Sequence, residues 1–81
     1  MEFSTIIVSE PNWKPLERLF SHQECAAFMY MGRVGTIEQY KHRDTRRYLN
    51  IDACTGDFYL HRGNNGYMKV SKAAALAYVF S

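Results

Sequence analysis

Between residues 36 and 70, four short runs of β-branched, aromatic and polar residues alternate with segments rich in turn-forming residues. The runs cover residues 36–42, 46–52, 57–62 and 67–70. The gaps between them contain Gly, Asn, Asp or Thr, which tolerate or promote tight turns. Short connections of this kind join neighbouring antiparallel strands. The pattern therefore predicts an antiparallel β-meander of four strands.

Side chains on a strand alternate between two faces, so the apolar positions identify the buried side. We expect the buried face to carry Ile37, Leu49, Ile51, Phe58, Leu60, Met68 and Val70. The outward face then carries Glu38, Tyr40, His42, Arg46, Tyr48, Asn50, Asp57, Tyr59, His61, Tyr67 and Lys69. This assignment follows from placing Ile37 inside, and it leaves Gln39 and Lys41 at the edge of the buried side.

Helical signals precede the meander. Residues 13–20 have apolar side chains at helical spacing and a proline near the start, which favours a short helix. Ser21 and Glu24 match a capping box, and the next residue suited to end a helix is Gly32. We therefore expect helical structure over residues 22–31, either as a second helix or as a continuation of the first.

A last helix is expected over residues 72–80, with Ser71 placed to cap it. Helices from both ends of the chain then cover the apolar face of the sheet. The predicted fold class is α+β: a four-stranded antiparallel meander packed on one face by an N-terminal helical segment and a C-terminal helix, forming a two-layer sandwich in a single small domain, residues 1–81. The sequence leaves open whether residues 3–8 add a fifth strand and whether residues 15–31 form one helix or two.

Composition is typical of a soluble globular protein. Hydrophobic residues make up 47% of the chain and aromatic residues 15%, enough for a packed core. The two cysteines, Cys25 and Cys54, match neither a disulfide framework nor a metal motif. Neither a signal peptide nor an apolar segment of membrane-spanning length is recognised. We expect a cytoplasmic protein with no cofactor and no membrane association.

Charge is uneven along the chain, although the formal net charge is only +2. Residues 33–81 carry eight basic and four acidic side chains, whereas residues 1–32 carry two basic and four acidic ones. The densest basic cluster lies at residues 41–47. It favours either contacts with phosphate or, more simply, a solvated turn.

The outward face combines tyrosines with basic side chains, and this combination suits single-stranded nucleic acid. Unpaired bases stack on aromatic rings of a sheet, while nearby Arg or Lys side chains meet the phosphates. We therefore predict a non-enzymatic binding module for single-stranded nucleic acid or a nucleic-acid complex. The candidate binding residues are Tyr40, Lys41, His42, Arg46, Arg47, Tyr48, Tyr59, His61, Tyr67 and Lys69.

Two other functions are compatible with the same residues. Tyr and Arg are enriched in protein interfaces, so the face can instead bind a protein partner or a second copy of the chain. A small accessory or inhibitor protein of a mobile element would act in this way. More remotely, His42 and His61 could supply the acid and base of a small metal-independent ribonuclease. The sequence contains no family signature that decides among these functions.

Overall fold

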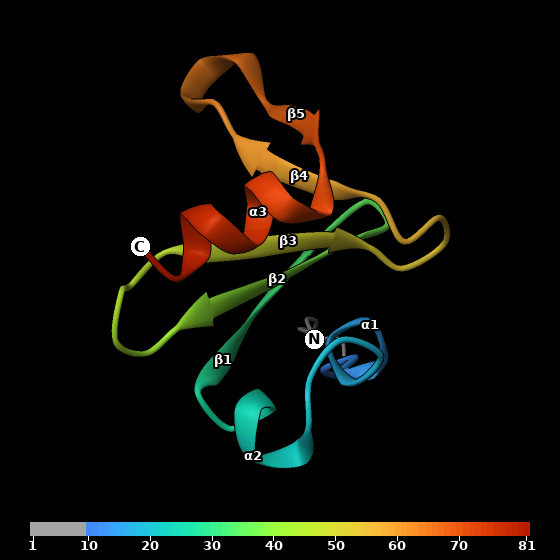
Figure 1. The fold of residues 1–81 in the computed structure, drawn as a ribbon. Coiled ribbons are helices and arrows are strands. Elements are labelled where there is room, and N and C mark those ends of the chain that lie inside the picture. The colour runs from blue at the N-terminus through green and yellow to red at the C-terminus, as the bar shows by residue number, and fades with distance from the viewer. Residues whose placement is uncertain (1–9) are drawn as a thin grey trace, which may run out of the picture.

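Over residues 10–81, the sheet of this protein has five strands rather than the predicted four. The computed structural model describes residues 10–81. Its strands are β1 (Phe28–Val34), β2 (Ile37–His42), β3 (Tyr48–Asp52), β4 (Phe58–His61) and β5 (Tyr67–Val70). They follow one another in chain order, and every neighbouring pair is antiparallel (Figure 1). The predicted meander is confirmed for β2 to β5, and β1 extends it by one strand.

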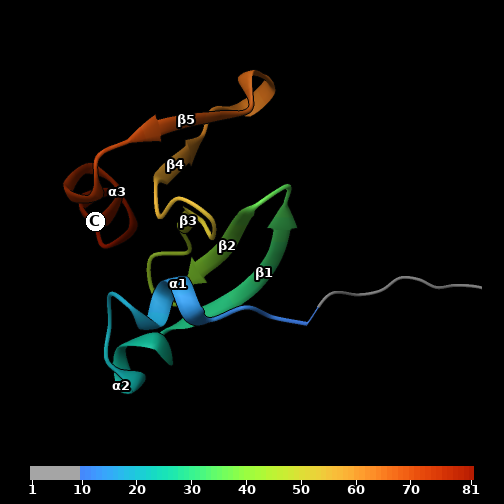
Figure 2. The ribbon, with the colours of Figure 1, turned by 90° about the vertical axis from the view of Figure 1, so that its right-hand side faces the viewer.

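In the described part of the chain, three short helices cover one face of the sheet. They are α1 (Lys14–Glu17), α2 (His22–Cys25) and α3 (Lys72–Val79), and a 3₁₀ turn, η2 (Gly63–Asn65), links β4 to β5. Figure 2 shows the helices on the same side of a curved sheet. The core consists of Leu16, Cys25, Phe28, Tyr40, Leu49, Ile51, Phe58, Ala75 and Val79. The α+β class is confirmed, with helices from both ends of the chain contributing to the core.

Serine caps begin α2 and α3, as the sequence predicts. The Ser21 hydroxyl accepts from the Glu24 amide at 3.1 Å, and the Glu24 carboxylate accepts from the Ser21 amide at 2.8 Å. The Ser71 hydroxyl accepts from the Ala74 amide at 3.1 Å. The open question about residues 3–8 lies outside the described residues. Among residues 10–81, no helix has both the length and the apolar character needed to cross a membrane.

The predicted helix continuing to Met31 is wrong, because α2 ends after one turn and the next residues form β1. Phe28 turns into the core, where its ring stacks on that of Phe20 with centroids 5.6 Å apart. The backbone before β1 is held by the Arg43 amide, which donates to the Ala27 carbonyl at 2.8 Å. Pairing with β2 thus decides the structure of a segment whose apolar composition also suits a helix.

A bulge in β1 brings Tyr30 and Arg33 to the same face of the sheet. Tyr30 pairs with Tyr40 and Arg33 pairs with Glu38, and the register shifts between Tyr30 and Gly32. Because one extra residue is inserted, two side chains three positions apart both point to the core side. Gly32 has a φ of +135°, which residues with a Cβ rarely adopt.

The predicted face assignment of β2 is also wrong. Its buried residues are Glu38, Tyr40 and His42. The alternate positions, Ile37, Gln39 and Lys41, lie on the other face. The alternation itself is as predicted, but the side that faces the core is reversed.

Tyr40 is buried because the N-terminal segment and β1 surround it. Its ring centroid lies 5.6 Å from that of Trp13 and 5.8 Å from that of Tyr30. Its hydroxyl donates to the Asn12 carbonyl at 2.6 Å, so the polar end is satisfied inside the core. Burial, with the nearby charge of Glu38 as the next cause, raises the pKa of Tyr40 well above its ordinary value.

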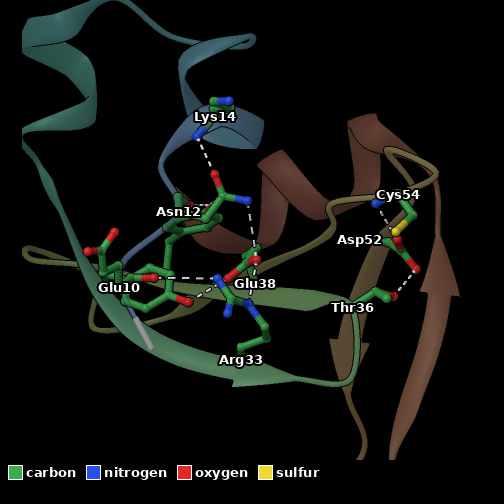
Figure 3. Close-up of polar contacts among 10 residues, drawn as sticks. Glu10, Asn12, Lys14, Arg33, Thr36, Glu38, Asp52 and Cys54 are labelled. Carbon is green, nitrogen blue, oxygen red and sulfur yellow. Dashed lines mark hydrogen bonds and ion pairs between the residues drawn. The ribbon is translucent and has the colours of Figure 1, made fainter. Parts of the chain in front are cut away.

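Glu38 is a buried carboxylate that joins three segments of the chain (Figure 3). Arg33 Nε donates to Oε2 at 2.7 Å, the Tyr30 hydroxyl donates to Oε1 at 2.5 Å, and Asn12 Nδ2 donates to Oε2 at 3.3 Å. Burial by itself would raise the pKa of Glu38, but these hydrogen bonds outweigh it and hold the pKa below its ordinary value. The buried charge is therefore paired, as such charges must be.

Replacing Glu38 with Gln keeps the size of the side chain but removes the charge that Arg33 and Tyr30 contact. We expect the free energy of unfolding to fall by about 1–2 kcal/mol, after allowing for the partly exposed guanidinium. Because the folded pKa lies below the unfolded one, this stabilisation is present above the ordinary value of 4.5 and is lost as the pH falls through the folded pKa.

Urea unfolding followed by the fluorescence of Trp13, the single tryptophan of the chain, measures this effect. The difference between wild type and Glu38→Gln should be full at neutral pH and should shrink at an acidic pH below the ordinary value of 4.5. Glu17→Gln, at an exposed position on α1, is the control and should change little. A difference of the same size at both pH values would contradict the account.

Candidate functional site

The face of the sheet opposite the core, called the open face below, carries a row of side chains that crosses four strands. Lys41 on β2 pairs with Tyr48 on β3, and His61 on β4 pairs with Tyr67 on β5. Tyr48 and His61 line the same pocket, which makes the row continuous. A second row, one pleat along, consists of Gln39, Asn50, Tyr59 and Lys69. The open face thus places aromatic, amide and basic groups side by side.

Two basic side chains lie over aromatic rings at this site. Lys41 Nζ is 5.9 Å from the ring centroid of Tyr48. Arg47 Cζ is 4.7 Å from the ring centroid of Tyr78, a residue of α3. A cation over a ring is attracted by the ring quadrupole, by about 0.5–1 kcal/mol where water has access. These contacts keep positive charge next to the rings.

A pocket of about 390 Å³ lies where β3 and β4 separate. The pairing of these strands extends only as far as Asn50 and Tyr59, after which they diverge, with α3 beside the opening (Figure 1). The pocket is lined by Gln39, Tyr48, Asn50, His61, Tyr67 and Tyr78. The rings of His61 and Tyr67 meet edge to face there, with centroids 5.2 Å apart. The volume falls within the range of about 300–1,000 Å³ typical of sites for one small ligand.

Asn50 is a buried polar residue at this pocket, with an exposed fraction of 2%. Its Nδ2 donates to the Tyr59 carbonyl at 3.1 Å. Its Oδ1 is buried and has no hydrogen-bond partner among residues 10–81. An unpaired buried acceptor costs about 1–3 kcal/mol, and native proteins contain few of them. This oxygen is therefore a polar atom at the pocket that the surrounding described side chains leave unpaired.

A contact between Gln39 and Tyr67 closes the open face above Asn50. Gln39 Nε2 donates to the Tyr67 hydroxyl, although β3 and β4 lie between their strands in the sheet. The contact forms because the sheet is concave on the side away from the helices (Figure 2). Asn50 is the direct cross-strand neighbour of Gln39. The side chains of Gln39 and Tyr67 therefore meet above Asn50. This explains why a residue on the open face is buried.

Six of the predicted binding residues lie together on the open face. They are Lys41, Tyr48, Tyr59, His61, Tyr67 and Lys69. Arg47 is exposed and lies against Tyr78 at the rim of the pocket. Arg46 is exposed in the turn between β2 and β3, with a φ of +66°. Lys69 Nζ is 3.4 Å from the Asp57 carboxylate, in an exposed pair that contributes little to stability.

Two predicted binding residues, Tyr40 and His42, belong to the core side and are absent from the open face. The His42 ring centroid lies 5.0 Å from that of Phe28 and 5.2 Å from that of Phe80. His42 is thus enclosed by aromatic rings, whereas His61 lines the pocket on the open face. The structure does not bring these two histidines together as an acid–base pair.

Three residues that line the pocket are not identified as binding residues by the sequence. Gln39 is missed because the predicted orientation of β2 is reversed. Asn50 is placed correctly on the outward face, but nothing in the sequence indicates that its oxygen lacks a partner. Tyr78 belongs to a helix on the core side, and no local pattern predicts that it reaches an opening in the sheet.

Comparison of the chain with protein-family models, with curated proteins and with solved structures gave no match. Both cysteines are free, Cys25 in the core and Cys54 at the surface. In the part of the chain from residue 10 onward, no three His, Cys, Asp or Glu side chains are grouped so as to hold a metal ion.

Tyr67→Phe tests the contact between Gln39 and Tyr67 across the open face. Removal of the hydroxyl leaves the Gln39 amide without its acceptor, so we expect a loss of about 1 kcal/mol in the free energy of unfolding and faster exchange of the Asn50 side-chain amide. Tyr59→Phe is the matched control, because the contact of Tyr59 with Asn50 uses the backbone carbonyl, which the substitution keeps. Urea unfolding and NMR hydrogen exchange measure both variants. Equal effects of the two substitutions would contradict the assignment.

Proposed function

We propose that this protein is a non-enzymatic module that binds single-stranded nucleic acid through the open face. The observation that carries the proposal is the continuous row of Lys41, Tyr48, His61 and Tyr67 across four strands, ending at a pocket. The helices leave this concave face uncovered. It therefore offers rings and charges to a ligand that lies across the strands.

The rings favour unpaired bases as the ligand. Bases in a duplex are stacked on each other, whereas those of a single strand are free to stack on Tyr48, Tyr59 or Tyr67. Each such contact contributes roughly 1–3 kcal/mol and is tolerant of sequence. The concave shape suits a flexible strand better than a rigid helix.

Four basic side chains are placed to meet the phosphates. Lys41 and Lys69 lie on the open face, and Arg46 and Arg47 lie at its end, in and beside the turn between β2 and β3. The contact of Arg47 with the ring of Tyr78 leaves its guanidinium exposed at the rim of the pocket. The proposal is binding rather than catalysis because His42 and His61 are not assembled as an acid and a base.

Salt dependence distinguishes this function from binding of a protein. A labelled single strand of about 12 nucleotides should bind at low salt, and its affinity should fall linearly in a plot of log K against log salt. The double variant Lys41→Ala and Arg47→Ala should weaken binding and reduce the slope by roughly 1.4, the value for two phosphate contacts on a single strand. Fluorescence anisotropy over a salt series measures both quantities.

The matched control for this experiment is the double variant Lys14→Ala and Arg18→Ala. It removes the same charge from exposed positions on and next to α1, which packs on the core side of the sheet. It should leave the slope unchanged. Equal effects of the two double variants, or absence of binding at low salt, would overturn the proposal.

The alternative, a protein interface or a homodimer on the same face, predicts a different result. Its binding would depend on aromatic burial and would be far less sensitive to salt. For a homodimer, Tyr59→Ala would lower the mass in solution. We expect instead that wild type and Tyr59→Ala both have the monomer mass by light scattering. A dimer that Tyr59→Ala dissociates would favour the alternative.

A further inference from the structure

The pocket between β3 and β4 contains a polar group that the stacking of a base on its aromatic rings would not require. Most of its lining is aromatic, yet it contains a buried amide oxygen with no partner among residues 10–81. We propose that it receives one unstacked base whose Watson–Crick edge carries an exocyclic amino group beside a bare ring nitrogen, which is adenine or cytosine. This inference rests on the proposed function and adds base selectivity to it.

Asn50 offers an acceptor at this pocket, Oδ1, which is unpaired within residues 10–81. Its Nδ2 is fixed by the hydrogen bond to the Tyr59 carbonyl, which determines the orientation of the amide. A reversed amide would place an oxygen against that carbonyl oxygen. Oδ1 therefore remains free to accept a hydrogen bond from a ligand. The donor that projects furthest from a base is its exocyclic amino group.

Gln39 lines the pocket and makes the contact that a bound base would replace. Its amide reaches across the open face and donates to the Tyr67 hydroxyl above Asn50. A base that enters the pocket displaces this amide, uncovers Oδ1 and frees the Tyr67 hydroxyl. The hydroxyl can then donate to the ring nitrogen next to the amino group. The acceptor Oδ1 of Asn50 and the donor hydroxyl of Tyr67 together match the Watson–Crick edge of adenine or cytosine, which carries an amino group beside a bare ring nitrogen.

The other bases fit this pair of groups less well. Uracil presents a carbonyl oxygen, an acceptor, where adenine and cytosine present the amino group. Guanine has an amino group, but its neighbour on the Watson–Crick edge is an N–H instead of a bare nitrogen. The walls formed by Tyr48 and Tyr78 stack on any base, so the selectivity comes from Asn50 and Tyr67.

Short strands that differ at one position test the inference. The probes are uridine heptamers whose central base is adenine, cytosine, uracil, or purine, which is adenine without its amino group. We expect the adenine and cytosine strands to bind about tenfold more tightly than the uracil and purine strands, the effect of about one hydrogen bond to a buried acceptor. Fluorescence anisotropy at one fixed low salt concentration gives the four affinities.

Two variants separate a binding role from a structural one. Gln39→Ala removes the competing amide and should raise the affinity for the adenine strand, whereas loss of a merely structural side chain would lower it. Asn50→Leu removes the acceptor and should abolish the difference between the adenine and purine strands. If Asn50→Leu does not fold, the adenine–purine comparison on the wild-type protein decides the question by itself.

The outcomes distinguish this inference from the function on which it rests. Equal affinities for the adenine and purine strands, with binding that still weakens as salt is added, would overturn the base pocket and leave the proposed function standing. Failure of all four strands to bind at low salt would overturn both. Tighter binding of the adenine and cytosine strands supports both.

Discussion

The arrangement of this protein depends on the buried carboxylate of Glu38. A charge this deep in a fold is stable only when its hydrogen-bonding capacity is filled, and here Asn12, Tyr30 and Arg33 fill it. These partners come from the N-terminal segment and from β1, so one interaction joins both to β2 (Figure 3). It also fixes which side of β2 faces the core. Every alternate residue of β2, including Gln39, is thereby turned to the open face.

The two faces of the sheet use tyrosine for different purposes. On the core side, Tyr40 is fully buried and its hydroxyl is bonded to a backbone carbonyl, so it acts in packing. On the open face, Tyr48 and Tyr59 are only half-buried, and Lys41 lies over the ring of Tyr48. The curvature of the sheet then brings side chains of β2 and β5 together above Asn50. The orientation of β2 that buries Glu38 thus also turns Gln39 toward this contact with Tyr67.

Local patterns in the sequence predict much of the fold. The serine caps at Ser21 and Ser71 and the strands β2 to β5 depend on neighbouring residues, and they are found where expected. The strand β1 is not predictable in this way, because its apolar residues suit a helix equally well until β2 pairs with them. The predicted orientation of β2 is wrong because it also depends on pairing with β1. Glu38 is expected outside unless the bulge that aligns Arg33 with it is known. The alternation of side chains predicts that Tyr48, Tyr59 and Tyr67 lie on one face of the sheet. That Tyr78 lines the pocket on this face is seen only in the three-dimensional structure.

The most direct test of the central claim is a two-dimensional NMR titration of labelled protein with a mixed pool of short single strands at low salt. The account predicts that shifts gather on residues 41, 48–50, 59–61 and 67–69, including the side-chain amide of Asn50, and that added salt reverses them. Residues of α1 and α2, on the core side, should not move. A spectrum that stays unchanged, or shifts confined to the helices, would contradict the assignment of the open face as a nucleic-acid-binding surface.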